Sequence, residues 1–211
     1  MKIQHLETET IPYILIDDTY DEDELAEIWK EFKFLTNARI LDNGTEDTRG
    51  AWKRVNGERM NLKNSNAKYL ESIYKNRRFS AILQHNRKLH KRKIYREHPH
   101  WLINEINTNY DVTQVSYYDE GNYYKTHSDC AVMTTLTWLW KEPKGFDGGE
   151  LTLHNKDIDI EIPLVNNRSI IFPSCVRHSV STIVKHKDTE PWDLMGRFCI
   201  SNFSYHKPND F

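Results

Sequence analysis

The sequence predicts an α+β protein that is mainly β, a double-stranded β-helix (jelly roll) with N-terminal helices packed on one sheet. After about residue 111, β-branched and aromatic residues dominate short runs, and turn residues separate these runs at intervals typical of all-β architecture. The preceding part instead has apolar residues at helical spacing. A helical layer followed by seven or eight short strands is typical of a jelly roll.

Length and composition fit one globular domain. The chain has 211 residues, 38% of them hydrophobic, and a formal net charge of -2. A chain of this length can bury one large core, so we expect a single domain. In it, residues 1–110 form a helical support layer with a short first strand, and residues 111–211 form the jelly-roll core. The balanced charge favours neither nucleic acid nor a membrane as the partner.

The sequence predicts a cytoplasmic protein. Its N-terminal residues contain no apolar run of signal-peptide length, and no later stretch approaches the roughly 20 apolar residues of a membrane span. The three cysteines, Cys130, Cys175 and Cys199, lack CxxC spacing, which argues against a disulfide framework or a zinc ribbon.

The N-terminal part begins with a short strand and a capped helix. Residues 13–16, Tyr-Ile-Leu-Ile, predict a buried strand, and Asp21 and Glu24 have the spacing of a capping box that opens a helix. The apolar residues of that helix share one face: Leu25, Ile28, Trp29 and Phe32.

Four further segments complete this part. Residues 42–57 are rich in Gly, Asn, Asp and Thr and predict a surface loop. Apolar residues recur at helical spacing in 67–74 and again in 101–106. A basic cluster begins at Arg87 and ends at Arg96. The cluster is either a solvated helix face or a contact for an acidic partner.

Seven runs predict the strands of the jelly roll, and they are 112–118, 133–140, 150–154, 158–162, 169–172, 178–183 and 197–205. Gly148 and Gly149 mark the plainest turn, where the backbone needs conformations closed to other residues.

Two histidines and an aspartate have the pattern of a metal site. His127 and Asp129 are two positions apart, so on an extended segment their side chains project to the same side. His178 follows at the head of a later strand. Two histidines and one carboxylate that leave positions open form the facial triad of non-haem iron oxygenases, whereas zinc more often recruits thiolate or four ligands. Each residue alone could be an ordinary polar residue at a strand end, but together they favour ferrous ion.

Four motifs around these residues resemble one family. Residues 118–129 fit the pattern Tyr-x-x-Gly-x-x-Tyr-x-x-His-x-Asp of the prolyl 4-hydroxylase-like branch of iron(II)- and 2-oxoglutarate-dependent dioxygenases. Residues 146–151 look like that family's Gly-Gly-Glu strand entry, and 171–174 look like its Phe-Pro-Ser approach to the distal histidine. Gly-Arg-Phe at 196–198 then begins the last strand, so the resemblance spans about residues 111–205.

The resemblance implies a ligand set and a co-substrate site. His127, Asp129 and His178 would hold ferrous ion, and 2-oxoglutarate would chelate it. The far carboxylate of 2-oxoglutarate would meet Arg197, because arginine stays charged and can bind a carboxylate through two parallel hydrogen bonds. Ser201 shares the face of Arg197 by period-two alternation and has a hydroxyl to offer.

Two aromatic residues complete the implied co-substrate site. Tyr118 matches a tyrosine that approaches 2-oxoglutarate from the strand before the metal. Trp138 stands where the family usually has a second tyrosine, so that contact departs from the family pattern; both residues could instead be core aromatics. The interval from His178 to Arg197 is longer than in the family, and we assign the excess to an insertion at 185–192 over the site mouth.

The implied activity is hydroxylation, with ferrous ion, 2-oxoglutarate and dioxygen required and ascorbate a candidate reductant. The favoured substrate is a prolyl residue in a peptide or protein, covered by residues 52–60 and by the insertion near Trp192. Demethylation of nucleic-acid bases ranks lower, because that branch continues its arginine strand into a further arginine that residues 198–204 lack. Hydroxylation of a small molecule is also compatible with these motifs, and so is a non-enzymatic jelly-roll binding module.

Overall fold

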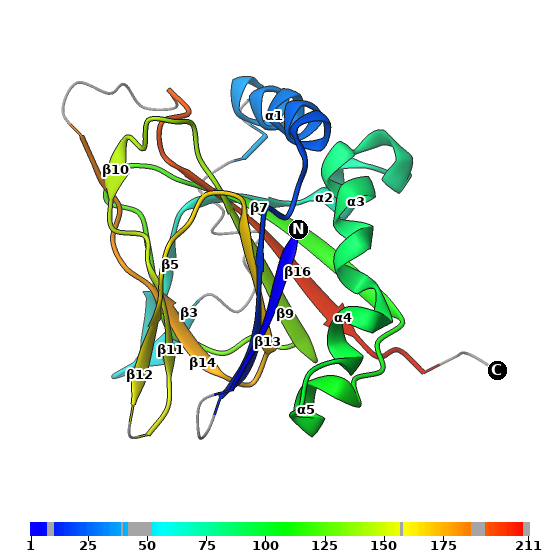
Figure 1. Cartoon of the computed structure of the whole chain (residues 1–211). Helices are drawn as coiled ribbons and strands as arrows, with labels where there is room; N and C mark the ends of the chain where they lie inside the picture. The colour runs from blue at the N-terminus through cyan, green and yellow to red at the C-terminus, as the bar shows by residue number, and fades with distance from the viewer. Residues whose placement is uncertain (8–10, 39, 42–51, 157, 187–192, 209–211) are drawn as a thin grey trace.

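The computed structural model describes residues 1–7, 11–38, 40–41, 52–156, 158–186 and 193–208. Two antiparallel sheets face each other, and helices cover the outer face of the larger sheet (Figure 1). This is the jelly roll with helices on one sheet that the sequence predicts.

The larger sheet has seven strands in the order β1-β2-β13-β9-β16-β7-β6. Their bounds are β1 Lys2–Glu7, β2 Pro12–Asp17, β6 Asn66–Tyr69, β7 Tyr110–Tyr118, β9 Met133–Leu139, β13 Arg168–Pro173 and β16 Arg197–Tyr205. Strands from the N-terminal part form both edges of this sheet, so that part contributes more to the sheets than the one short strand expected.

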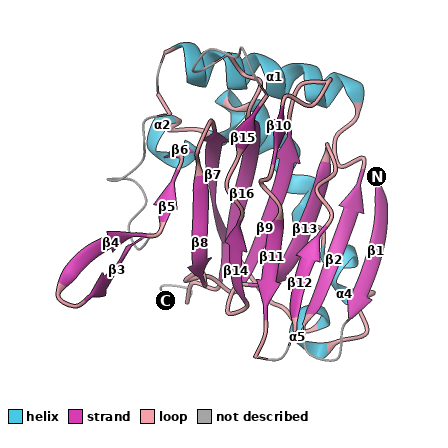
Figure 2. Cartoon of the chain, turned by 90° about the vertical axis from the view of Figure 1, so that its left-hand side faces the viewer, coloured by secondary structure: helices cyan, strands magenta, loops and turns pink. Residues whose placement is uncertain are grey.

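The smaller sheet has five strands in the order β12-β11-β14-β8-β5. Their bounds are β5 Lys63–Asn64, β8 Tyr123–His127, β11 Leu151–His154, β12 Asp159–Ile162 and β14 Arg177–Val180. Two smaller pairs join β10 Phe146–Asp147 to β15 Val184–Lys185 and β3 Trp52–Val55 to β4 Glu58–Asn61. The β3–β4 hairpin projects beyond the β5 and β8 side of the smaller sheet (Figure 2).

The helical layer lies on the larger sheet. Its elements are α1 Glu22–Asn37, α2 Leu70–Ile73, the 3-10 helices Arg77–Phe79 and Asn86–His90, α3 Ala81–His85, α4 Arg92–Arg96 and α5 Trp101–Asn104. The capping box is present as predicted: Glu24 N donates to Asp21 Oδ1 at 2.9 Å, and Asp21 N donates to Glu24 Oε2 at 3.0 Å. The basic cluster is mostly exposed, and Lys88 pairs with Glu24.

Alternation along β16 separates two cores. Phe198 packs against α1, with its ring stacked on Phe32 at 4.0 Å between centroids. Cys199 instead packs in the core between the two sheets. Each fully buried apolar side chain contributes about 1.5–3 kcal/mol, so this alternation holds β16 in place. It also turns Arg197 and Ser201 toward the space between the sheets, as period-two spacing predicts.

Two N-terminal predictions are partly wrong. Residues 67–74 were expected to be helical; residues 70–73 do form α2, but residues 67–69 belong to β6, because Ala67 pairs with Ser116 on β7 and this pairing overrides local periodicity. Within 42–57, expected to be a loop, residues 52–55 form β3. The Asn56–Gly57 turn that joins β3 to β4 has positive φ at both residues, as a tight hairpin requires. Residues 42–51 lie outside the described residues.

No helix in the described part of the chain combines the length and apolar character needed to cross a membrane.

Candidate metal centre and adjoining cavity

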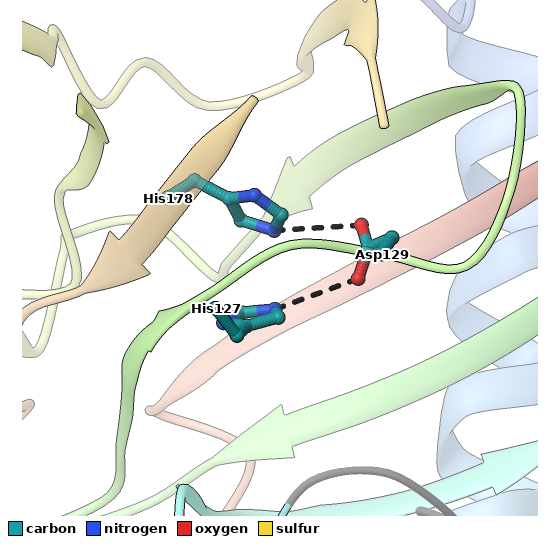
Figure 3. A group of neighbouring side chains, drawn as sticks. All are labelled: His127, Asp129 and His178. Atoms are coloured by element: carbon teal, nitrogen blue, oxygen red, sulfur yellow. Dashed lines mark ion pairs between the residues drawn. The ribbon is translucent and has the colours of Figure 1, made fainter. Parts of the chain in front are cut away.

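The structure brings His127, Asp129 and His178 together. One nitrogen or oxygen from each lies within 4.8 Å of the others. His127 Nε2 is 3.5 Å from Asp129 Oδ1, and His178 Nε2 is 3.4 Å from Asp129 Oδ2 (Figure 3). Metal–ligand bonds of about 2.1 Å place neighbouring donors about 3 to 3.4 Å apart, so these spacings suit a shared ion.

Strand pairing positions the two histidines. His127 ends β8 and lies opposite His178 on β14. His127 and Asp129 project to the same side, as predicted, although β8 stops at His127 and Asp129 lies just beyond the strand. Two residues of neighbouring segments hold Asp129 in place. Its N–H donates to Ser174 O at 3.0 Å, and Thr134 Oγ1 donates to its Oδ2 at 2.7 Å.

Backbone carbonyls fix which nitrogen of each ring carries a proton. His127 Nδ1 lies 2.8 Å from Lys125 O, and His178 Nδ1 lies 3.0 Å from Val176 O. A carbonyl oxygen only accepts, so each Nδ1 donates, and a ring that carries this one proton presents its Nε2 lone pair to the Asp129 carboxylate. Such an arrangement of the second ring nitrogen is usual for metal-binding histidines.

The charge states also suit a cation. Burial, together with the neighbouring His127, lowers the pKa of His178 to about 4, so His178 is neutral near pH 7. Burial alone would raise the pKa of Asp129, but the nearby His127, His178 and Thr134 lower it overall. Asp129 is therefore ionised and faces the neutral ring of His178.

A cavity of about 160 Å³ adjoins the three residues. A cavity of this size suits a small ligand. Arg197 lines the cavity and is fully buried. Its Nη1 donates to Gly149 O, but its Nε and Nη2 have no partner among the described residues. A buried guanidinium with free donors fits an anionic ligand.

The other predicted co-substrate residues also line this cavity. The Arg197 guanidinium carbon lies 4.5 Å from the ring centroid of Tyr118. Trp138 is fully buried, and its Nε1 has no hydrogen-bond partner in the described chain. Ser201 Oγ lies 3.6 Å from Cys199 Sγ. No ligand contact tests the roles assigned to these residues, which stay predictions.

The sequence analysis missed several cavity residues, among them Tyr124, Lys63 and Gln114. Tyr124, which belongs to the quoted motif, stacks on His127 with 3.5 Å between ring centroids. Lys63 and Gln114 both line the cavity, and Lys63 Nζ donates to Gln114 Oε1 at 2.8 Å. A two-residue strand such as β5 has no periodicity to detect, so no local signal could have found Lys63.

The predicted insertion is only partly described. Val184 and Lys185 form β15, which pairs with β10, and Lys185 Nζ lies 2.9 Å from both Asp119 Oδ1 and Asp193 Oδ1. Residues 187–192, including Trp192, lie outside the described residues, so their predicted position over the site mouth is not tested.

Comparison with known proteins agrees with this geometry. Residues 113–205 match the model of the 2OG-Fe(II) oxygenase superfamily. An uncharacterized PKHD-type hydroxylase of Synechocystis is 30% identical over 88 residues, which are 34% of this chain and 29% of that protein. The match therefore spans less than a third of the relative's length.

Solved structures share the fold at low sequence identity. A prolyl-4-hydroxylase from Pseudomonas putida has a TM-score of 0.63 and 13% identity, with 94% of this chain and 95% of that chain covered. A prolyl hydroxylase from Trichoplax adhaerens, in complex with a hypoxia inducible factor peptide fragment, has a TM-score of 0.64 and 16% identity, with 92% and 83% covered. Residues 113–205 thus match the 2OG-Fe(II) oxygenase superfamily model, and the chain shares its fold with these two prolyl hydroxylase structures.

Proposed function

We propose that this protein is an Fe(II)- and 2-oxoglutarate-dependent dioxygenase whose iron is held by His127, Asp129 and His178. One observation carries the proposal: two histidine Nε2 atoms converge on one carboxylate, each 3.4–3.5 Å from a different oxygen of Asp129. Three metal-ligating side chains at this spacing can share one cation. Two imidazoles and one carboxylate are the donor set of non-haem iron oxygenases, and three ligands leave positions for co-substrate and oxygen.

The cavity supplies the remaining functions. Arg197 would bind the far carboxylate of 2-oxoglutarate through its free Nε and Nη2, while Gly149 O keeps the guanidinium in place. Ser201 would offer a hydroxyl beside it. Leu136 and Val180 line the same cavity and would exclude water from the reacting centre.

When bound, the iron supplies activation of dioxygen, which couples decarboxylation of 2-oxoglutarate to succinate with hydroxylation of the substrate. We assign the protein no acid–base residue, because its side chains act by binding and orienting the reactants. Ascorbate would serve as an auxiliary reductant. A cytoplasmic location suits the three free cysteines.

The substrate that we propose is a prolyl residue in a peptide or protein. The Trichoplax structure holds a peptide fragment in the same fold, which supports this choice. The β3–β4 hairpin projects beyond β5, which pairs with β8, the strand that ends at His127 (Figure 2). We propose that it folds over a peptide laid across the site. Nucleobase demethylation ranks lower because β16 has no arginine after Arg197.

Anaerobic titration with ferrous ion and 2-oxoglutarate tests the proposal. The wild-type protein should develop the weak visible charge-transfer band of the chelate, and His127→Ala should not. His206→Ala, which removes an exposed histidine near the end of the described chain, is the matched control and should behave like wild type. Absence of the band in wild type, or an unchanged band in His127→Ala, would refute the iron site.

Substrate identity needs a separate experiment. The purified protein is incubated with a peptide library, iron, 2-oxoglutarate and ascorbate, and peptides are searched by mass spectrometry for one added oxygen. Oxygen on proline supports the prolyl assignment. Oxygen added only to nucleobases in a parallel incubation with oligonucleotides would replace it with nucleobase demethylation.

A further inference from the structure

Lys63 places a second buried cation in the cavity. Its side chain is 9% exposed. The ammonium donates to Gln114 Oε1 at 2.8 Å and to Ser116 Oγ at 3.0 Å, and it lies 5.3 Å from the ring centroid of Tyr124. Within the described chain, no carboxylate lies within ion-pair distance of it. A buried ammonium whose hydrogen-bond partners are both neutral lacks a countercharge.

Burial of an uncompensated charge is costly, so buried charges are normally paired. An ammonium also has three donors, of which the two neutral acceptors take two. Burial lowers the pKa of Lys63 to about 8, and the more distant Cys199 and Asp129 offset only part of this effect. A carboxylate on a ligand would supply both the charge and the third acceptor.

The strand register shows where this ammonium lies. Gln114 and Ser116 on β7 are the partners of Ser201 and Cys199 on β16. Along β16, these two paired positions lie between Arg197, at the start of the strand, and Phe203. Phe203 in turn pairs with Thr134, whose hydroxyl holds Asp129. Lys63 therefore flanks the path between Arg197 and the three metal-ligand residues.

Charge balance points to the same ligand. A bound Fe²⁺, ionised Asp129 and the cations of Arg197 and Lys63 would give the cavity a net charge of about +3 before co-substrate binds. A dianionic keto acid would lower this to about +1, and Arg197 alone leaves one of its two carboxylates without a cationic side chain. From this arrangement, which rests on the proposed function, we propose that Lys63 is a second carboxylate-binding residue for the keto acid held between Arg197 and the metal.

The proposal is tested by equilibrium binding with the full chain under anaerobic conditions. Wild type, Lys63→Met and Lys63→Arg are titrated with 2-oxoglutarate in the presence of ferrous ion, with the chelate absorption as readout. Lys125→Met is the matched control, because Lys125 lies on the neighbouring strand β8 with its side chain exposed. Affinity for Mn²⁺ alone and the melting temperature are measured for each protein. The titration is repeated with 2-oxopentanoate, which keeps the chelating end but lacks the far carboxylate.

We expect Lys63→Met to raise the Kd for 2-oxoglutarate at least tenfold. Lys63→Arg should recover most of the affinity, Lys125→Met should match wild type, and Mn²⁺ affinity should not fall in any variant. If the loss persists with 2-oxopentanoate, Lys63 binds the chelating carboxylate. If it disappears, Lys63 binds the far carboxylate.

Two results would overturn the proposal. In one, Lys63→Met binds both keto acids with wild-type affinity. In the other, Lys63→Met and Lys63→Arg lose Mn²⁺ affinity and melting temperature together, which would make Lys63 only a link between the two sheets. A wild-type protein that binds metal but neither keto acid would instead overturn the proposed function, so the two failures are distinguishable.

Discussion

Arg197 Nη1 donates a hydrogen bond to the carbonyl oxygen of Gly149, a residue with φ of +82° that precedes β11. A Cβ at Gly149 would lie 2.5 Å from Ile183 Cδ1 and 3.5 Å from Arg197 Cδ. The positive φ and the limited space explain the glycine here. The contact fixes one end of the guanidinium and leaves Nε and Nη2 for a ligand.

Replacement of Arg197 should therefore separate co-substrate binding from metal binding. Arg197→Met should weaken the binding of 2-oxoglutarate by at least about 2 kcal/mol, which is a roughly 30-fold rise in Kd, because the far carboxylate loses a buried charged partner. Mn²⁺ affinity should stay at the wild-type value. Arg177→Met, at an exposed position on β14, is the control. Equal losses in the two variants, measured by anaerobic titration, would contradict the role of Arg197.

Two tryptophans allow a matched test of the indole donor. The Nε1 atoms of Trp138 and Trp140 are both buried without a partner among the described residues. Only Trp138 lines the cavity beside the metal centre. Trp138→Phe should raise the Kd for 2-oxoglutarate about three- to tenfold, since a neutral hydrogen bond contributes about 1 kcal/mol. Trp140→Phe should leave it unchanged. A Trp138→Phe protein with wild-type affinity would show that Trp138 is only a core aromatic.

The ion pair between Asp17 and Arg168 should make stability depend on pH. Arg168 Nε and Nη2 donate to the two carboxylate oxygens at 2.5 and 3.1 Å and so join β2 to β13. The Arg168 hydrogen bond lowers the pKa of Asp17 below its ordinary value of about 3.9. A lowered folded-state pKa stabilises the protein above the unfolded-state pKa, and this contribution is lost as pH falls through the folded-state value.

Arg168→Met should accordingly reduce the free energy of unfolding by about 1 kcal/mol at pH 7, measured by urea denaturation. The difference from wild type should shrink toward zero as the pH falls below about 3.9 and through the lowered folded-state pKa of Asp17. A difference that stays constant over this range would mean that Arg168 stabilises the sheet by packing alone.

Co-substrate binding should also depend on pH through Lys63. Burial lowers its pKa to about 8, and the protonated ammonium is the form that binds a carboxylate. Affinity for 2-oxoglutarate should therefore fall as pH rises above about 8, by at most about tenfold per pH unit. Lys63→Arg stays charged and should lack this decline. The charged or titratable groups near Lys63 are Cys199, Asp129, Arg197 and Tyr124. An equal decline of affinity in wild type and Lys63→Arg would assign the titration to one of these groups.

The longer strands could be predicted because their signals are local. β7, β9, β13 and β16 are runs of β-branched and aromatic residues, and α1 begins at a capping box formed by neighbouring residues. β1 could not be predicted, because its side chains are mostly exposed and polar. β6 was mistaken for helix because pairing with β7, distant in sequence, decides its conformation. The hairpin was missed although Asn56–Gly57 is a strong local turn signal.

In the candidate site, too, features with a local sequence signal could be predicted and features set by distant contacts could not. The order of motifs predicted which two histidines and which aspartate meet, but Asp129 lies just beyond the end of β8. Its position comes from Thr134 and Ser174, contacts that no spacing rule contains. Lys63 was missed because it reaches the cavity only through the pairing of β5 with β8.

The N-terminal strands limit how far this protein can be truncated. β2 covers the edge of β13, where Ile14 lies opposite Ile171 and Ile16 opposite Ser169, and both isoleucines are fully buried. A fragment trimmed to the family-matched residues 113–205 would expose β13 and β7 as bare edges, and such edges template aggregation. Expression trials on that segment alone should give inclusion bodies, so domain excision must keep the N-terminal strands.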